Sequence, residues 1–353
     1  SCVVTPWNPV MPSHDGFGLY RFFSLPIPSR APYRYGYPKV DPFIWRKLRR
    51  TSFSLVHSHC PFSSGRLALY SSRYHDVPLV ATFHSKYRTD LEHSLPPWMV
   101  KRIMKRVLDF FNAADEVWIP QAQVEDTVRE YGYKGRLTVV ENGIDLAMEN
   151  LDSILDFKAE SRRRIGIDRS EMLLLFVGQH IWEKGVEVII RAISMLRDLP
   201  VKMAFIGTGY AVDDMKSLIR SLGVEDRVTL HGVIRDRDTL KQYYAAASLF
   251  LFPSFYDNAP LVVREAAMMG TPSILLHGAT AAEVIVDGKN GFLANRTPES
   301  YAALIRELYN NPERIDIAAR GASSTLTRSW RDVMEEVVQR YNEIIERHVR
   351  RKK

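Results

Sequence analysis

The chain has 353 residues, of which 46% are hydrophobic, and it carries a formal net charge of +7. This length predicts two domains, each with its own core. The longest apolar runs, Met172 to Val177 and Ala245 to Phe252, are too short to span a bilayer, and no signal peptide is expected. Two cysteines, Cys2 and Cys60, exclude a disulfide framework and a four-cysteine zinc site, so a cytoplasmic location is expected.

The positive charge lies mainly in the N-terminal half. Residues 1–165 hold 23 Lys/Arg against 17 Asp/Glu, a net charge of +6, whereas residues 166–353 hold 25 against 24, a net charge of +1. This distribution fits an anionic partner, either a phospholipid surface, a nucleic acid or an acidic acceptor. A basic protein without such a partner fits it equally well.

The N-terminal half predicts alternating strands and helices. Pro6–Pro42 is rich in Pro, Tyr and Gly, which predicts loops with short strands. Four strands are predicted beyond it, at Ser54–His59, Leu79–Ser85, Glu116–Pro120 and Leu137–Glu141. The helices predicted between them are Gly65–Tyr74, Trp98–Asn112 and Gln121–Tyr131.

The helix predicted from Trp98 has two chemically distinct faces. One face is apolar, and the other carries Lys101, Arg102, Lys105 and Arg106. Basic amphipathic helices can lie on anionic membranes, which predicts a peripheral contact with the inner face of the membrane. The alternative is that the apolar face packs on the sheet while the basic residues are solvated.

The C-terminal half shows a clearer alternation. Apolar runs of six or seven residues that end at Gly or Pro are typical of a parallel sheet buried on both faces. The predicted strands are Met172–Gly178, Val201–Gly207, Arg227–Gly232, Ser248–Pro253, Thr271–Leu276 and Gly291–Ala294, with helices such as Val186–Arg197 and Tyr210–Leu222 between them. This pattern predicts a doubly wound, Rossmann-like domain.

Two further segments complete the expected organisation. The Arg-rich stretch from about Leu146 to Ser170 is interpreted as the interdomain connection, and Trp330–Arg350 predicts a long amphipathic helix. The expected domains are residues 1–160, with the helix of residues 331–353 added to them, and residues 161–330.

The segment from Asp257 to Glu265 is the most informative in the chain. Asp257 follows a buried strand, at the edge where open α/β sheets bind ligands, and Glu265 lies inside the helix that Pro260 is expected to start. The free N–H groups at the start of that helix suit a diphosphate. The two carboxylates on either side of this anion site suit the hydroxyl groups of a sugar. The alternative is a local role for both acids.

This arrangement resembles the E-x7-E element of the retaining, GT-B-fold glycosyltransferases of family 4. The segment Phe176–Gly185 is similar to the family's strand end with its E-K-G sequence, and Gly207-Thr208-Gly209 and Val228–Ile234 follow in the family's order. Glu141–Asp145 resembles the turn before the linker, and Ala81-Thr82-Phe83-His84 ends a strand as the family's active-site histidine does. The resemblance covers about residues 1–345.

The resemblance implies an α/β protein of GT-B type, with two Rossmann-like, doubly wound domains facing a cleft and a C-terminal helix that returns to the N-terminal domain. It implies a donor site for a nucleotide-diphosphate hexose in the second domain and an acceptor side in the first. The catalytic residues would be His84 and Asp257. The donor-binding residues would be Gly178, Gln179, Lys184, Gly207, Val233, Ile234, Asp257, Asn258, Ala259, Pro260, Leu261 and Glu265.

Four departures from the family pattern accompany these matches. Gln179 stands where the family has Arg, and Asp257 stands where the family has Glu. The family's F-G is replaced by Ala259-Pro260, and Pro260 removes one N–H donor. The segment Ser1–Pro6 resembles the family's second strand, so the first strand, glycine-rich loop and first helix are expected to be missing from this sequence.

The function expected from these features is retaining transfer of a hexose from a UDP- or GDP-linked donor to a saccharide, lipid or other hydroxyl acceptor. Lys184 would offset the charge of the leaving diphosphate, and Asp257 would hold sugar hydroxyls. No cofactor, no metal and no nucleic-acid partner are expected, although His57-Ser58-His59-Cys60 superficially resembles a ligand cluster. The alternative function is a nucleotide-sugar-binding protein with little or no turnover.

Overall fold

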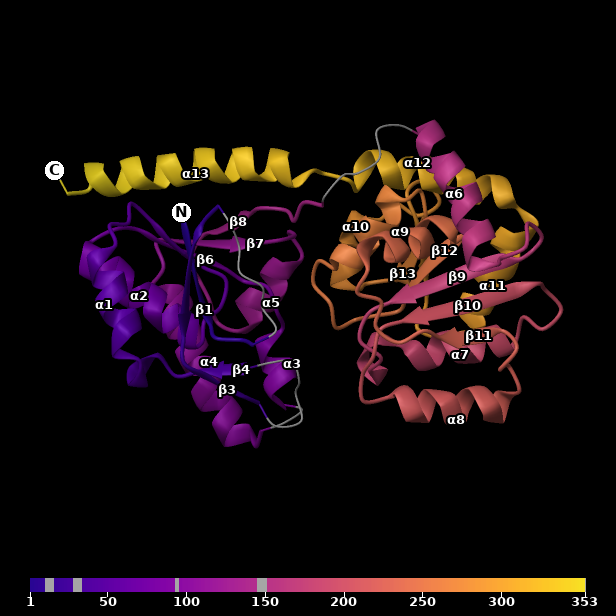
Figure 1. Ribbon diagram of the computed structural model, residues 1–353, viewed down its shortest axis with the longest axis horizontal. Helices are drawn as coiled ribbons and strands as arrows, with labels where there is room; N and C mark the ends of the chain where they lie inside the picture. Colours follow the sequence, from indigo (N-terminus) through magenta and orange to yellow (C-terminus); the bar gives the residue numbers. More distant parts are fainter. Residues whose placement is uncertain (10–15, 28–33, 93–94, 145–150, 353) are drawn as a thin grey trace. The chain divides into compact units, whose positions relative to one another are not determined.

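A computed structural model describes residues 1–9, 16–27, 34–92, 95–144 and 151–352. The chain forms two compact units, which are described separately (Figure 1). The first unit comprises Ser1–Glu141 with Met334–Lys353, and the second comprises Asn142–Val333. Asp145 of the expected linker turn, the beginning of the expected connection and parts of Pro6–Pro42 lie outside the described residues.

The first unit is built on a parallel sheet in the order β5-β6-β7-β8. Its strands are β5 (Val56–Ser58), β6 (Leu79–Thr82), β7 (Glu116–Ile119) and β8 (Leu137–Val139), all inside the predicted ranges. Helices α2 (Ser63–His75), α3 (Tyr87–Glu92), α4 (Pro97–Asn112) and α5 (Val124–Glu130) connect them. The three predicted helices are thus confirmed, and α3 is an addition.

The first fifty residues add two small pairs of strands and a helix. β1 (Cys2–Pro6) pairs in parallel with β2 (Gly18–Phe22), while β3 (Ser24–Pro26) and β4 (Arg34–Gly36) form an antiparallel pair. The 3₁₀ turn η1 (Pro38–Val40) precedes α1 (Pro42–Arg50), a helix that the sequence did not predict. Its start signal was present, because the Asp41 carboxylate caps the Ile44 N–H at 3.2 Å and proline follows at the first position.

The predicted C-terminal helix is confirmed as α13 (Trp330–Arg350). From Met334 onward it belongs to the first unit. Its Tyr341 ring stacks on Trp118 of β7 at 5.6 Å, and the Tyr341 hydroxyl lies 2.5 Å from Nδ1 of His57. Arg347 adds an ion pair with Glu116 at 2.8 Å. The last helix therefore packs on β5 and β7 of the first unit's sheet through a ring stack, a hydrogen bond and an ion pair.

The second unit contains a six-stranded parallel sheet with helices on both faces (Figure 1). The order is β11-β10-β9-β12-β13-β14, so the direction of winding reverses between β9 and β12. The strands are β9 (Met172–Val177), β10 (Val201–Ile206), β11 (Val228–Leu230), β12 (Leu249–Phe252), β13 (Ser273–Leu276) and β14 (Phe292–Ala294). This is the doubly wound order that the sequence predicted, and ligands bind such sheets at the reversal point.

The helices of the second unit alternate with these strands. They are α7 (Val186–Ser194), α8 (Val212–Leu222), α9 (Arg237–Ala246), α10 (Leu261–Met268), α11 (Pro298–Asn310) and α12 (Pro312–Thr325), with the 3₁₀ turns η2 (Trp182–Lys184) and η3 (Thr280–Val284). Every residue of β9, β12 and β13 is buried. Burial on both faces explains why these strands are continuous apolar runs.

The division between the units differs from the expected one. The expected domain boundary at residues 160/161 falls inside α6 (Leu151–Ile165), whereas the units divide after Glu141. Helix α6 packs against α9 of the second unit. Its Arg162 donates hydrogen bonds to the carbonyl oxygens of Ala246 at 3.0 Å and Glu171 at 2.7 Å. The segment interpreted as a connection is therefore part of the second unit's own helical layer.

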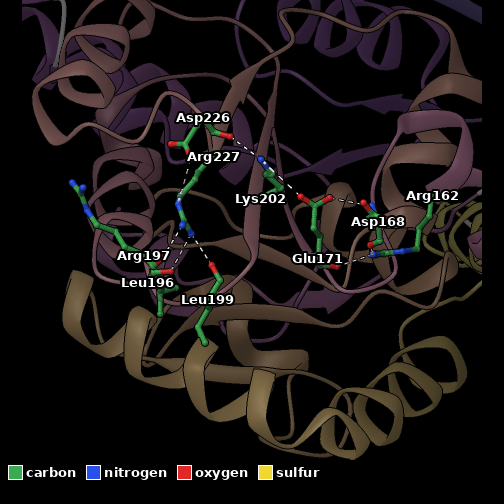
Figure 2. A network of polar contacts seen from close by, with 9 residues as sticks. All are labelled: Arg162, Asp168, Glu171, Leu196, Arg197, Leu199, Lys202, Asp226 and Arg227. Atoms are coloured by element: carbon green, nitrogen blue, oxygen red, sulfur yellow. Dashed lines mark hydrogen bonds and ion pairs between the residues drawn. The ribbon is translucent and has the colours of Figure 1, made fainter.

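Arginine side chains also hold the amino-terminal edge of this sheet together (Figure 2). Arg227, directly before β11, donates to the carbonyl oxygens of Leu199 at 2.6 Å, Arg197 at 2.7 Å and Leu196 at 3.2 Å. Lys202 donates to the carbonyl oxygen of Asp226 at 2.8 Å. These contacts involve carbonyl groups of the segment between α7 and β10 and of the residue before Arg227, on the edge opposite to the carboxyl ends of the strands.

We expect Arg227→Met to lower the free energy of unfolding by about 1–3 kcal/mol, because three carbonyl groups each lose one donor. Urea denaturation followed by circular dichroism measures this loss. Arg220→Met on α8 is the matched control, since Arg220 is exposed and contacts Ser217 of its own helix. A similar change in both variants would mean that the arginine–carbonyl contacts contribute nothing specific.

Candidate functional site

Most of the predicted donor residues lie at the carboxyl ends of the second unit's strands. Gly178 and Gln179 directly follow β9, and the Gly178 N–H donates to the carbonyl oxygen of Ile206 on β10 at 3.0 Å. Lys184 ends η2, and Gly207 directly follows β10. Because the sheet is parallel, these residues share one edge, at the point where the winding reverses.

Lys184 and Asp257 form an ion pair at this edge. The Lys184 side chain is buried, and its ammonium group lies 3.0 Å from Oδ1 of Asp257 and 5.5 Å from the ring centre of Phe252. The other carboxylate oxygen of Asp257 accepts a hydrogen bond from the Ser254 hydroxyl at 2.7 Å. The two predicted residues are thus adjacent, and an incoming anion would compete with Asp257 for Lys184.

Helix α10 follows Asp257 and carries Glu265. The sequence placed Pro260 at the first helical position, whereas the structure makes it the N-cap and Leu261 the first helical residue. The difference arises because Pro260 has extended backbone angles (φ −69°, ψ 122°). The helix start and Glu265 therefore lie on the same helix, within two turns of each other.

A tyrosine that the sequence analysis did not select fixes the Glu265 carboxylate. The Tyr244 hydroxyl, from α9, donates to Oε2 of Glu265 at 2.9 Å. Burial raises the pKa of Tyr244 well above its usual value, and the neighbouring Glu265 carboxylate raises it further. The hydroxyl therefore stays protonated and remains a donor. This contact fixes one of the two carboxylate oxygens of Glu265.

The segment between the ion pair and α10 has mixed burial. Asn258 is buried, and the carbonyl oxygen of Ala259 accepts a hydrogen bond from Asn142 at 3.4 Å. Leu261, at the start of α10, is 40% exposed. The loop thus presents its helix-starting end to solvent while its middle is held by the second unit's own residues.

Gly207 and the residue pair Val233-Ile234 lie along the same edge. Gly207 has φ +136°, and a Cβ there would be 1.9 Å from the carbonyl oxygen of Gly178, so only glycine fits. Val233 is 57% exposed, while Ile234 packs against the core. Both follow β11 and could present backbone groups to a nucleotide base, as the family resemblance implies.

His180 is a site feature that the sequence analysis missed. Its ring is 1% exposed and packs against Phe176 and Phe205, with no hydrogen-bond partner for either ring nitrogen among the described residues. Burial lowers the pKa of His180 to about 4, so the ring is neutral at physiological pH. A neutral ring beneath the Gly207 turn adds no charge to the edge where Lys184 lies.

His84 belongs to a cluster of three histidines in the first unit. Its Nε2 lies 2.9 Å from Nδ1 of His59, and the His59 and His57 ring centres are 4.2 Å apart. The ring nitrogens of His57 contact the hydroxyls of Thr82, at 2.7 Å, and Tyr341. β5 and β6 are neighbours, so the residues after their ends come together.

The cluster is a hydrogen-bonded set of imidazoles at the carboxyl edge of the first sheet. Within the described parts of the chain, no group of three or more His, Cys, Asp or Glu side chains is placed to hold a metal ion. The position of His84 opposite the donor site stays a prediction, because it concerns the arrangement of the two units.

The histidine cluster predicts acid sensitivity of the first unit. Desolvation, followed by the charge of His59, lowers the pKa of His84 to about 4, and desolvation also lowers the pKa of His59, although both rings retain solvent contact. Since an unfolded histidine titrates near pH 6.5, the unfolded state binds more protons below that pH. Stability should therefore fall as the pH drops from about 6.5 to 4.

The fall in stability is measured as the change in the urea midpoint for unfolding of the first unit between neutral and acidic pH. We expect His59→Gln/His84→Gln to flatten the pH dependence relative to the parent, while His180 continues to destabilise the second unit in acid. An unchanged slope in the double variant would show that the cluster does not titrate as expected.

Family models match both halves of the chain. The model described as "Glycosyltransferase Family 4" matches residues 2–148, and the one described as "Glycosyl transferases group 1" matches residues 157–323. A D-inositol 3-phosphate glycosyltransferase of Xylanimonas cellulosilytica is 30% identical over 287 residues, which cover 78% of this chain and 68% of that protein. An alpha-monoglucosyldiacylglycerol synthase of Streptococcus pneumoniae is 25% identical, over 85% of this chain and 69% of that protein.

Solved structures share the fold. The sucrose-phosphate synthase of Thermosynechococcus elongatus superimposes with a TM-score of 0.78 at 18% identity, over 98% of this chain and 89% of that one. HepE of Anabaena, in complex with UDP-glucose, gives a TM-score of 0.75 at 16% identity, over 97% and 99% of the two chains. The two Rossmann-like units thus form a GT-B fold.

The edge of the second sheet, with its lysine, its two acids and its glycine turns, therefore lies in an enzyme of the glycosyl-transfer class. The chain belongs to glycosyltransferase family 4.

Proposed function

We propose that the protein is a retaining glycosyltransferase that moves a hexose from a UDP- or GDP-linked donor to a hydroxyl group of a saccharide, a lipid or another acceptor. The observation that carries the proposal is the Lys184–Asp257 ion pair beside the start of α10, with Glu265 further along that helix. One cation and two carboxylates around a helix N-terminus suit a diphosphate flanked by hydroxyl groups.

The named relatives and structures support the donor class. One relative is a D-inositol 3-phosphate glycosyltransferase, and HepE was solved in complex with UDP-glucose. In this chain the donor diphosphate would meet the Lys184 ammonium and the N–H groups at the start of α10. Glu265, oriented by Tyr244, would accept hydrogen bonds from the ribose hydroxyls.

The proposed chemistry requires no nucleophilic side chain. As the bond to the diphosphate breaks, Lys184 offsets the negative charge that develops on the leaving group. Asp257 holds hydroxyls of the sugar while the anomeric carbon gains positive character, and the acceptor oxygen approaches from the same face. His84 would face the sugar or the acceptor. The reaction is proposed to need no metal and no cofactor.

Titration calorimetry with UDP and GDP, followed by a transfer assay with UDP- and GDP-hexoses, tests the proposal. Binding together with transfer, a product that keeps the donor's anomeric configuration and activity that persists in EDTA would support it. Binding without transfer would favour the alternative of a nucleotide-sugar-binding protein. The absence of binding to either nucleotide would overturn both.

We also propose that the basic face of α4 meets anionic lipid. Val100, Met104 and Val107 of this helix are buried in the core, while Lys101, Arg102, Lys105 and Arg106 are exposed beside Trp98, which is 67% exposed. The apolar face therefore packs on the sheet, and the basic face is open. Among the described helices, none is both long and apolar enough to cross a membrane.

Weak, salt-sensitive sedimentation with anionic liposomes is the expected result for this face. Each basic residue near such a surface contributes about 1 kcal/mol, and salt screens the attraction. Changing all four basic residues to Glu should abolish sedimentation and leave UDP binding intact. A control with the same net charge carries four Glu substitutions at Arg163, Arg164, Arg220 and Arg237 and should still sediment. If the parent and the α4 variant sediment equally, the basic face of α4 is a solvated surface that does not bind lipid.

A further inference from the structure

One tyrosine hydroxyl joins two loops at the carboxyl edge of the second sheet. Tyr210 follows the Gly207–Gly209 turn after β10. Its hydroxyl donates to Oε2 of Glu183 and accepts a hydrogen bond from the Trp182 N–H at 3.3 Å. Both partners belong to η2, the turn after β9, so a single hydroxyl holds a side chain and a backbone group of the neighbouring loop.

The turn that Tyr210 holds is the one that positions Lys184. η2 consists of Trp182, Glu183 and Lys184, and its last residue pairs with Asp257 at 3.0 Å. The turn has little freedom after Lys184, because Gly185 has φ +71° and a Cβ there would be 2.4 Å from the carbonyl oxygen of Pro253. A displacement of Trp182 or Glu183 would therefore move Lys184.

The ring of Tyr210 contributes little to the core, since the residue is 63% exposed. Partial burial raises the pKa of Tyr210, and the hydrogen bond to Glu183 raises it further, so the hydroxyl remains a donor at physiological pH. Glu183 has the same sign of charge as a diphosphate and is next to Lys184 in the chain. Held by Tyr210, its carboxylate has a fixed partner other than Lys184.

We propose that Tyr210 is a positioning residue for donor binding, which acts through Glu183 and the Trp182 backbone to hold Lys184 where it meets the diphosphate. This inference rests on the proposed function. It assigns Tyr210 no contact with the ligand. Loss of the Tyr210 hydroxyl should therefore weaken binding of the diphosphate part of the donor and leave binding of the nucleoside part unchanged.

Titration calorimetry of the full chain with UDP and with uridine tests this expectation. Tyr210→Phe should weaken UDP binding about tenfold and leave uridine binding and the melting temperature unchanged. Glu183→Leu, which removes the acceptor of the Tyr210 hydroxyl, should weaken UDP binding in the same direction, and the two substitutions together should cost less than the sum of their separate effects. Tyr309→Phe, which removes one hydroxyl from α11, is the matched control and should bind UDP as the parent does.

Three results would overturn the inference while leaving the proposed function standing. These are UDP binding by Tyr210→Phe equal to that of the parent, an equal loss of UDP and uridine binding, and additive effects of the two substitutions. GDP and guanosine replace UDP and uridine if the parent prefers guanine. A parent that binds neither UDP nor GDP would overturn the proposed function and this inference with it.

Discussion

Lys184→Ala should weaken the binding of UDP and GDP by about 10- to 100-fold, because a charge-assisted contact contributes about 1.5–3 kcal/mol. The structure explains why this lysine should matter more than the other lysines of the second unit. It is only 9% exposed, and its ammonium group already holds one carboxylate at 3.0 Å. Calorimetric titration of parent and variant measures the change.

The same substitution leaves Asp257 without its cation, so stability has to be measured together with binding. Asp257 keeps the Ser254 hydroxyl at 2.7 Å, and its side chain is 19% exposed, which limits the penalty of an unpaired charge. Lys184→Met/Asp257→Asn removes both charges and should still bind UDP weakly. Lys216→Ala, which breaks an exposed pair with Asp213 on α8, is the control.

Unchanged UDP affinity in Lys184→Ala, with a folded protein, would mean that the donor site is misplaced. Glu265→Ala examines the other end of the same site. Because Glu265 is proposed to hold the ribose, this variant should weaken uridine binding as well as UDP binding.

The strands of the second unit were predictable because their environment leaves a simple pattern. β9 is buried along its whole length, so Met172–Val177 is an uninterrupted apolar run, and Gly178 marks its end. α13 was predicted with both ends for a related reason, since a long helix repeats its apolar positions several times. An apolar pattern that extends over many residues remains recognisable even where single positions depart from it.

Helix α6 was not predicted because tertiary contacts stabilise it, whereas α1 was missed although its local start signal is present. α6 is polar and arginine-rich, and a sequence pattern cannot show that Arg162 binds the carbonyl oxygens of Ala246 and Glu171. α1 follows a stretch rich in Pro and Tyr, which obscured the start signal at Asp41-Pro42. In α6 a charged side chain has specific partners that only the folded chain supplies.

The sequence predicted individual residues of the proposed donor site, but not the ion pair and hydrogen bonds that join them. Lys184 and Asp257 were assigned to the diphosphate and to the sugar, and only the structure shows that they pair with each other. Tyr244 and Tyr210 lie on other segments, so no local motif connects them with Glu265 and Glu183. The pairing of His59 with His84 could have been inferred, because both follow strands that are neighbours in a parallel sheet.

Asp257→Asn should have an effect on nucleotide binding opposite to that of Lys184→Ala. Asp257 pairs with the Lys184 ammonium group, so a diphosphate would have to compete with it. A neutral amide at position 257 keeps the size of the side chain and releases this competition. UDP binding should therefore be unchanged or up to about tenfold tighter.

Transfer of the hexose should nevertheless fall about 100-fold in Asp257→Asn, because the carboxylate is proposed to stabilise the sugar as positive charge develops at the anomeric carbon. Calorimetry with UDP and initial rates at saturating donor separate the two effects in one preparation. Asp238→Asn on α9, whose carboxylate is 85% exposed, controls for the loss of one negative charge. A loss of UDP affinity as large as that in Lys184→Ala, or full transfer activity, would contradict this role of Asp257.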